Sequence, residues 1–387
     1  MSKIIERPLL FLLAACTLFS CQKEEQVTVP IAPIIKYVVM PNESEAIPGT
    51  DVTIAGVGFA SGDSIICTSL EGEPSFSPEV VKVTDYAVIL SVPKDAGGSY
   101  QVSVTRANLT TVLDGTLKIA YVIYIKDLKM PTGILKPGET VSVTGEGFEN
   151  EDLVKFGSSS YPSGCAFTSN ALLTDDGISF NVPQQCYGVN TLTLVRGKKI
   201  CSLGELDIAV DVGDELGGGI VYYTSDDGVH GLISAMGHIG SNTEYYGPSI
   251  PSSYASGTSA DIYTGKTNTA SLVSKFASYI QDGNTYSGTT AAGKCDQYTF
   301  TVDTLSYDDW FLPSQDELIE MFKVKDMLRN KGVDLPANNY WTSTEYDYSA
   351  GWVWAHYYVN FYESTNIVSD GASVDGWTIG IMPIRQF

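Results

Sequence analysis

An internal repeat constrains the fold of this chain more than any other feature of its sequence. The segment PGTDVTIAGVGFASGDSI at residues 48–65 returns as PGETVSVTGEGFENEDLV at residues 137–154, with a constant offset of 89 residues. Further on, VPKDAGGSYQVSVTR at residues 92–106 matches VPQQCYGVNTLTLVR at residues 182–196, with an offset of 90. Similarity at a fixed offset over two separate segments indicates two copies of one folding unit.

Each copy has the pattern of an all-β unit. In the first copy Val52 and Ile54 alternate with polar residues, as Val141 and Val143 do in the second, which is the period of a half-buried strand. Turn residues rich in Gly and Asp recur every ~8–12 residues, as expected for a β-sandwich. We therefore expect two β-sandwiches, at residues 31–120 and 121–211.

The G-x-GF segments, residues 56–59 and 145–148, resemble the IPT/TIG family of immunoglobulin-like domains. The resemblance covers roughly residues 31–211. It implies an immunoglobulin-like sandwich in each copy, in which the glycines permit a tight turn and the Phe fills the core. It implies no activity, and in exported proteins such modules serve as spacers or binding platforms. We interpret them as a stalk.

The N-terminus has the pattern of a signal peptide at residues 1–20. Lys3 and Arg7 precede an apolar stretch, residues 9–18, that is too short to span a bilayer. The following LFSC resembles the lipobox of bacterial lipoproteins, which implies a diacylglycerol on Cys21. The alternative is an ordinary secretion signal with an incidental cysteine. QKEEQ, in a linker at residues 21–30, is similar to the export tag of Bacteroidetes-type surface lipoproteins. We expect lipid anchoring in the outer membrane and exposure on the cell surface.

Charge and cysteine content limit the partners. The formal net charge of −22 argues against nucleic acid, because phosphate binding needs clustered Lys and Arg. Five cysteines follow Cys21, and their spacing matches no metal motif, so we expect no metal and no cofactor. An exported protein can form disulfides, and Cys165 with Cys186 is the best candidate pair, although an unpaired state is equally open.

From residue 212 the sequence changes to a mixed α and β pattern. Strands are expected at residues 220–223 and 231–234, and a helix from Asn268 or Thr269 to Gly283. Ser314 and Glu317 form a capping box that begins a helix ending at Gly332. The final residues, 377–387, are expected to form one last strand.

Five segments of this region together resemble a known family. They are Gly218–Tyr222, Ala291–Cys295, Trp310–Leu318, Tyr340–Glu345 and Ile381–Phe387. The family is named after the C-terminal domain of the Legionella collagen-like adhesin and is similar to the Fibrobacter major paralogous domain. Both look related to C-type lectin-like folds. The resemblance implies an α+β C-type lectin-like domain at residues 212–387 with an adhesion role. Phe311 and Met382 replace basic residues of the pattern, which argues against anion binding.

Binding residues are expected in the loops of this domain rather than in its matched motifs. The loop at residues 345–354 supplies the main candidates for ligand binding, namely Tyr346, Asp347, Tyr348, Trp352 and Trp354. Another loop, residues 247–263, adds Tyr254 and follows Tyr245 and Tyr246. Aromatic faces stack on sugar rings, and neighbouring carboxylates and amides bond hydroxyls. The alternative is that Trp352 and Trp354 fill a core, as we expect for Trp310 and Trp341. Glu345 is interpreted as a structural carboxylate.

No motif of a known catalytic site occurs in the sequence. Asp308 and Asp309 are adjacent rather than placed across a cleft, as glycosidase carboxylates would be. We therefore expect a binding protein rather than an enzyme: a surface lipoprotein that binds carbohydrate or host matrix ligands through its terminal domain. The alternatives are a structural component of a surface complex and a hydrolase whose site leaves no sequence pattern.

Overall fold

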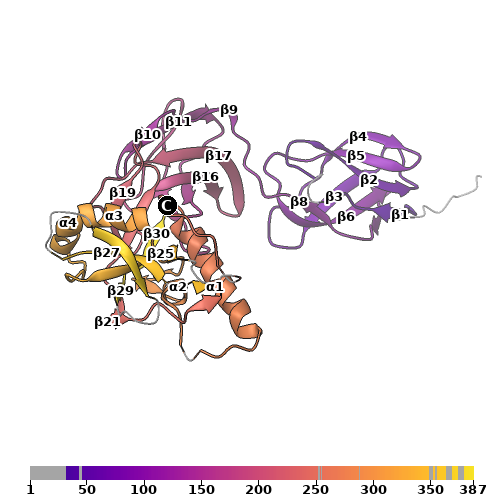
Figure 1. Cartoon of the computed structure of the whole chain (residues 1–387). Helices are drawn as coiled ribbons and strands as arrows, with labels where there is room; N and C mark the ends of the chain where they lie inside the picture. Colours follow the sequence, from indigo (N-terminus) through magenta and orange to yellow (C-terminus); the bar gives the residue numbers. More distant parts are fainter. Residues whose placement is uncertain are drawn as a thin grey trace, which may run out of the picture. The chain divides into compact units, whose positions relative to one another are not determined.

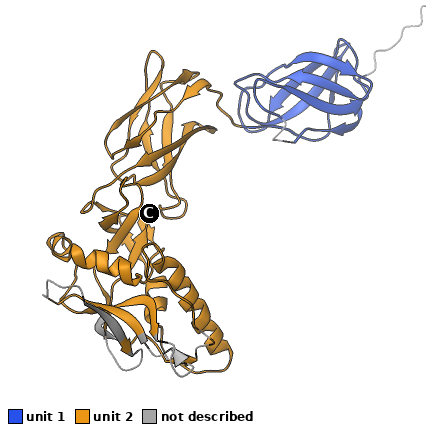
Figure 2. Cartoon of the chain, turned by 45° about the horizontal axis from the view of Figure 1, so that its top comes forward, with its two compact units in different colours: residues 1–120 blue, residues 121–387 orange. Residues whose placement is uncertain are grey.

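The computed structural model divides the chain into two compact units, residues 1–120 and residues 121–387 (Figure 2). The described residues are 32–42, 46–251, 253, 255–286, 288–347, 352–353, 355–362, 368–373 and 379–387. The expected signal peptide, Cys21 and the linker lie outside this part. No helix within it is both long enough and apolar enough to cross a bilayer. Strands predominate in both units, so the chain is a multidomain, mainly β protein.

Unit 1 is built from two antiparallel sheets (Figure 1). One sheet has the order β1-β2-β5-β4, and the other has β3-β6-β7 with β8 also paired to β6. Val52 and Ile54 of β2 are buried with residues of the second sheet in one core, as their alternation predicts. The strands are β1 (Lys36–Val39), β2 (Asp51–Val57), β3 (Ser64–Ser69), β4 (Glu79–Thr84), β5 (Ala87–Ser91), β6 (Gly98–Arg106), β7 (Leu109–Val112) and β8 (Leu117–Ile119).

The second copy of the repeat forms a similar pair of sheets at the start of unit 2. Their orders are β14-β15-β11-β9 and β10-β17-β16-β12-β13. Val141 and Val143 are buried in a core of their own, separate from that of unit 1. The strands are β9 (Lys126–Lys129), β10 (Ile134–Leu135), β11 (Thr140–Glu146), β12 (Leu153–Gly157), β13 (Phe167–Asn170), β14 (Leu172–Leu173), β15 (Gly177–Asn181), β16 (Gly188–Arg196) and β17 (Lys199–Ile208).

The repeated motif encodes the same turn and the same ion pair in both copies. Gly58 and Gly147 both have φ of 111°, where only glycine is unstrained. Arg106 Nε lies 2.6 Å from a buried Asp63 carboxylate oxygen, and Arg106 Nη2 donates to the carbonyl oxygen of Gly58 at 2.9 Å. In the second copy Arg196 makes the equivalent bonds, at 2.7 Å and 2.9 Å. The matching Asp and Arg positions of the sequence repeat therefore hold the glycine turn against the sandwich.

The rest of unit 2 combines sheets with short helices (Figure 1). One sheet has the order β18-β19-β20-β30 and another has β21-β29-β25-β27-β28. The helices are α1 (Gly265–Gln281), α2 (Ala291–Asp296), α3 (Gln315–Lys323) and α4 (Lys325–Asn330). The strands are β18 (Glu215–Leu216), β19 (Gly219–Thr224), β20 (Gly231–Ala235), β21 (Ile239–Glu244), β22 (Ile250–Pro251), β23 (Phe300–Val302), β24 (Leu305–Tyr307), β25 (Asn339–Asp347), β26 (Trp352–Val353), β27 (Ala355–Asn360), β28 (Val368–Ser373), β29 (Ile379–Ile381) and β30 (Ile384–Gln386). The C-type lectin-like assignment stays a prediction.

The helix starts and the last strand differ partly from expectation. The capping box of Ser314 and Glu317 is confirmed, but the helix breaks at Val324 into α3 and α4 instead of running on to Gly332. Helix α1 begins at Gly265, before the expected caps. The last strand is divided around Pro383 into β29 and β30, because proline has no amide hydrogen for the sheet.

The end of the chain lies where the second sandwich meets the rest of unit 2 (Figures 1 and 2). The ring of Phe387 packs edge-on against Tyr187 of the sandwich, with ring centroids 5.3 Å apart. Phe387, Val221 and Ile233 are buried in the same core as the second sandwich. This sandwich therefore shares its core with the terminal region.

The suggested disulfide between Cys165 and Cys186 is wrong, because both thiols are free. Cys186 is fully buried in the core of the second sandwich, where its thiol hydrogen-bonds the Tyr161 hydroxyl. Cys165 is partly buried and packs against the edge of the same core. Both cysteines are therefore part of the packing of this sandwich rather than of a disulfide.

Candidate functional site

The two loops proposed from the sequence as binding loops meet in the structure. Strand β22 of the loop at residues 247–263, here the first loop, pairs antiparallel with β26 of the loop at residues 345–354, here the second loop. Ile250 lies opposite Val353, and Pro251 lies opposite Trp352. The pairing joins segments that are about 100 residues apart in the chain, so both sets of candidate residues contribute to one surface region.

Glu345 holds the first loop against strand β25. Its carboxylate accepts hydrogen bonds from the backbone amide of Ser256, at 3.0 and 3.1 Å, and from that of Gly257, at 3.1 Å. The amide of Glu345 in turn donates to the hydroxyl of Thr258 at 2.8 Å. The side chain is buried, and buried carboxylates need such donors. The interpretation of Glu345 as a structural carboxylate is therefore confirmed.

The structure describes some of the predicted binding residues fully, some by their backbone alone, and others not at all. Tyr346 is 46% exposed, and its ring stands edge-on to Tyr357 at 4.8 Å between centroids. Asp347 ends β25 and Trp352 begins β26, but their side chains lie outside the described part of the structure. Tyr348 and Trp354 lie wholly outside it, as does Tyr254 of the other loop. Their assignment as binding residues stays a prediction.

The two tryptophans expected in the core are there. Trp310 is 2% exposed and donates its indole N–H to the carbonyl oxygen of Tyr307 at 3.0 Å. Trp341 is fully buried and packs edge-on against Tyr246 at 5.3 Å between ring centroids. Trp341 shares a core cluster with Tyr246, whereas Trp310 packs in a separate cluster with Ala235 and Tyr307.

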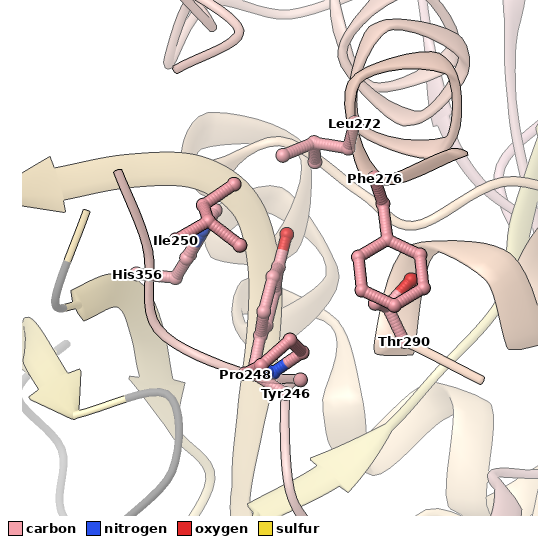
Figure 3. Close-up of a pocket in the computed structure, with 8 residues that line it drawn as sticks. Tyr246, Pro248, Ile250, Leu272, Phe276, Thr290 and His356 are labelled. Carbon is pink, nitrogen blue, oxygen red and sulfur yellow. The ribbon is translucent and has the colours of Figure 1, made fainter. Parts of the chain in front are cut away.

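A small pocket adjoins the paired loops through Ile250, which lines it and lies opposite Val353 in the strand pairing (Figure 3). Its cavity measures about 20 Å³. The ring of Tyr246 stacks on the imidazole of His356, with centroids 3.7 Å apart and planes 17° apart. The other walls are mostly apolar, and the lining residues are Tyr246, Gly247, Pro248, Ile250, Leu272, Phe276, Thr290 and His356.

Two polar atoms of this pocket have no partner among the residues that the structure describes. They are the hydroxyl oxygen of Tyr246 and Nδ1 of His356, and both side chains are more than nine-tenths buried. The other side of the His356 ring is engaged with the backbone of Thr344. A phenol can donate and an imidazole nitrogen can accept, so the pocket presents complementary functions to a single hydroxyl group.

The electrostatics of the pocket keep both groups neutral near pH 7. Burial lowers the pKa of His356 to about 3, and its hydrogen bond to Thr344 only partly opposes this effect. Burial likewise raises the pKa of Tyr246 well above its ordinary value. The pocket is therefore suited to an uncharged polar group rather than to an ion.

The size of the cavity limits what can enter it. A volume of ~10–15 Å³ is needed for one water molecule, so this pocket takes one hydroxyl-sized group and no sugar ring. Pro248, Ile250 and Phe276 are partly exposed and form its rim. Because the two polar atoms are buried, a ligand hydroxyl reaches them only when side chains around the pocket move. A ring would remain outside, against the loops.

Other candidate groups have structural partners. Both carboxylate oxygens of Asp309 accept from Arg385, at 2.7 and 3.1 Å. Glu317 accepts from the amide of Ser314 at 2.7 Å and from that of Gly265 at 3.3 Å, and burial raises its pKa to about 7. Within the described residues, no cluster of metal-ligating side chains occurs.

Sequence reasoning did not identify His356 as part of the site. The alternation along residues 352–358 places His356 on the same strand face as Trp352 and Tyr358, which was the only signal available. The four-residue spacing of Leu272 and Phe276 did predict an apolar helix face, and that face forms the wall opposite His356.

Comparison with known proteins identifies no family. No family model and no curated protein matches the chain. The SGBP-B protein of the Bacteroides ovatus mixed-linkage glucan utilization locus is 14% identical over 48% of this chain and 47% of its own, with a TM-score of 0.17. The surface glycan-binding protein PbSGBP-B of Prevotella bryantii is 15% identical over 56% of each chain, with a TM-score of 0.26. A titin A168–A169 fragment is 15% identical over 46% of this chain and 100% of its own, with a TM-score of 0.22.

These likenesses are partial. The chain spans about half the length of the two glycan-binding proteins that it matches. At TM-scores of 0.17 to 0.26, they decide neither the fold nor the function of this chain.

Proposed function

We propose that this chain is a lipid-anchored cell-surface protein that binds carbohydrate, without catalysis, where the 247–263 and 345–354 loops meet. The single observation that carries the proposal is the pair of unpartnered polar atoms, the Tyr246 hydroxyl and His356 Nδ1, in the pocket that adjoins these loops. A buried polar group that lacks a hydrogen bond costs ~1–3 kcal/mol. A ligand hydroxyl placed between them would remove this cost.

The chemistry of the pocket favours a sugar over other neutral ligands. Sugars combine hydroxyl groups with apolar C–H faces, and this pocket combines a neutral donor and acceptor with apolar walls from Leu272 and Phe276. Tyr245 directly precedes the pocket residue Tyr246, and Tyr346 directly follows Glu345. Both rings are exposed and offer surfaces on which a sugar ring can stack. Ligand sites in proteins commonly have this composition, mostly apolar with a few placed polar groups.

The proposed anchoring rests on the N-terminal sequence. The LFSC segment follows a short apolar stretch, as in bacterial lipoproteins, and acylation of Cys21 would attach the chain to the outer membrane. Each buried methylene contributes ~0.8 kcal/mol, so two or three acyl chains hold a protein stably. Exposure on the outer face rests on the acidic QKEE segment.

The test is an array of soluble glycans and immobilised matrix proteins, probed with the purified chain. Binding to one or more glycans supports the proposal, and addition of the same free glycan should displace the chain. Binding to matrix proteins that survives enzymatic removal of their glycans would contradict it, as would the absence of binding to any glycan. Release of shortened products from a bound glycan would contradict the non-catalytic part of the proposal.

A further inference from the structure

A larger cleft lies where the second sandwich meets the terminal region of unit 2. Its volume is about 400 Å³, within the ~300–1,000 Å³ usual for ligand sites. It is separate from the pocket that adjoins the loops and shares no residue with it. The lining residues are Ser158, Ser159, Ser160, Val189, His230, Lys266, Asp309, Gln386 and Phe387.

Arg385 fixes the two walls of this cleft relative to each other. Its guanidinium donates to the carbonyl oxygen of Ser160 at 2.6 Å on the sandwich side, and to the Asp309 carboxylate on the other side. It also donates to the carbonyl oxygen of Gly217 at 2.8 Å and to the hydroxyl of Tyr187 at 3.0 Å. The Arg385 side chain is 1% exposed. The cleft is therefore already formed, and a ligand would not have to order it.

The lining of the cleft is polar but nearly balanced in charge. Ser158 and Ser159 supply hydroxyls, and Gln386 supplies an amide that can both donate and accept. Asp309 already has its charge compensated by Arg385, which leaves Lys266 as the other charged side chain of the lining. Val189 is 37% exposed and offers an apolar contact between these groups.

The cleft continues as a groove over the exposed face of the second sandwich. A hollow of about 820 Å³ runs along strands β12, β16 and β17, and shares Ser158, Ser159 and Val189 with the cleft. Thr191 and Thr193 line it from the exposed face of β16, beside Lys155 and Glu205. The side chains that line this hollow also combine hydroxyls, short apolar groups and charges of both signs. An extended ligand can thus lie across both hollows.

Three ligand classes can be compared with this lining. A polyanion is disfavoured, because the protein carries a net charge of −22 and the cleft has only one lysine. A basic peptide is disfavoured by the same lysine and by the compensated Asp309. An uncharged chain rich in hydroxyls matches the mixture of donors, acceptors and small apolar surfaces. We propose that this junction cleft is a second carbohydrate site, which binds a neutral oligosaccharide that continues over the sandwich face.

The experiment uses hydrogen–deuterium exchange of the purified full chain with laminarin, xylan, galactomannan and polygalacturonate, each added separately. At least one of the three neutral polysaccharides should slow amide exchange at residues 156–160. Ser159→Trp fills the exposed side of the cleft, and should abolish this protection and weaken binding about tenfold or more. Ser274→Trp, on the exposed face of helix α1, lines neither site and should bind as the parent does. Lys266→Gln tests the same cleft without added bulk and should weaken binding severalfold.

Each outcome decides the inference. Protection at 156–160 that Ser159→Trp or Lys266→Gln removes supports it. No protection there with any of the neutral polysaccharides overturns it, as does protection by polygalacturonate alone. Protection at residues 246–257 without protection at 156–160 overturns this inference but leaves the proposed function standing. Protection at 156–160 alone supports the junction cleft and contradicts the proposed site at the loops.

Discussion

Arg385 donates a hydrogen bond to the hydroxyl of Tyr187 at 3.0 Å across a sequence separation of 198 residues. The bond joins the C-terminal strand to the core of the second sandwich. It lies beside the edge-on contact of Phe387 with the same tyrosine. A stalk of two equivalent sandwiches, as the repeat suggests, does not describe this arrangement. The second sandwich forms one compact unit with the terminal region, and the first is a unit by itself.

Replacement of Arg385 by Met should destabilise unit 2 alone. The change leaves Asp309 and the carbonyl oxygen of Gly217 without their donor, and it removes one of the two donors to the carbonyl oxygen of Ser160, which keeps the Tyr187 hydroxyl. The loss costs ~3 kcal/mol, the lower end of the usual range because Asp309 is 29% exposed. Differential scanning calorimetry should show a lower melting temperature for one transition only. Arg106→Met is the matched control, since it breaks the Asp63 ion pair of unit 1 and should lower the other transition. A shift of both transitions by either variant would refute the division into independent units.

His356 should make the stability of unit 2 fall in mild acid. Its pKa is about 3 in the folded protein and about 6.5 in the unfolded chain, so the unfolded state binds more protons between these values. The free energy of unfolding then decreases as pH falls below ~6.5, by about 2 kcal/mol between pH 6.5 and pH 5. His356→Phe keeps a ring against Tyr246 and should remove this part of the slope.

Chemical unfolding at pH 7 and pH 5 measures this effect directly. The control is Ser274→Ala, which alters an exposed residue that does not titrate and should keep the full slope of the parent. Equal slopes for the parent and His356→Phe would mean that His356 takes up its proton as readily in the folded protein as in the unfolded chain, contrary to the effect of its burial.

Replacement of Cys21 by Ala should abolish lipid attachment. The expectation follows from the LFSC segment, in which the cysteine thiol is the acylated group. Cells that express the parent and the variant are labelled with a palmitate analogue, and the chain is then isolated and its label compared. Cys295→Ala, which alters a buried cysteine of unit 2, should retain the label. Equal labelling of Cys21→Ala and the parent would show that the N-terminus is an ordinary secretion signal.

The tryptophans of the second loop distinguish binding from packing. A tryptophan that stacks on a sugar should lose binding on replacement by Ala while the melting temperature is kept, whereas a core tryptophan costs ~3–5 kcal/mol. Thermal melts and glycan binding are compared for Trp352→Ala, Trp354→Ala and Tyr348→Ala. If all three unfold unit 2, or all three bind as the parent does, the loop at residues 345–354 is not the site.

Local patterns in the sequence predicted local structure well. The capping box needs only Ser314 and Glu317, three residues apart, and it occurs as expected. The predicted start of helix α1 is wrong, because Asn268 and Thr269 are good capping residues whose side chains bind elsewhere in the fold. Asn268 donates to the carbonyl oxygen of Ser259 at 2.7 Å, and Thr269 to that of Leu312 at 3.2 Å. These tertiary partners leave no trace in the helical pattern.

The candidate site was only half predictable for the same reason. Loop composition pointed to the two segments that β22 and β26 join, because aromatic and polar residues gather in both. The stack of Tyr246 on His356 brings together residues from distant parts of the chain, and no spacing rule connects them. The junction cleft likewise depends on how Arg385 positions two domains, which the internal repeat does not encode.

The central claim is tested most directly by removal of one oxygen atom from the pocket, in the variant Tyr246→Phe. The substitution keeps the stack on His356 and removes the unpartnered hydroxyl, so affinity for a glycan found on the array should fall about tenfold. The melting temperature should stay the same or rise. Tyr222→Phe is the matched control, because Tyr222 is equally buried and its hydroxyl also lacks a partner among the described residues, but it lies outside the pocket. Loss of affinity in Tyr246→Phe alone is the predicted result. Equal affinity of both variants and the parent would contradict the account.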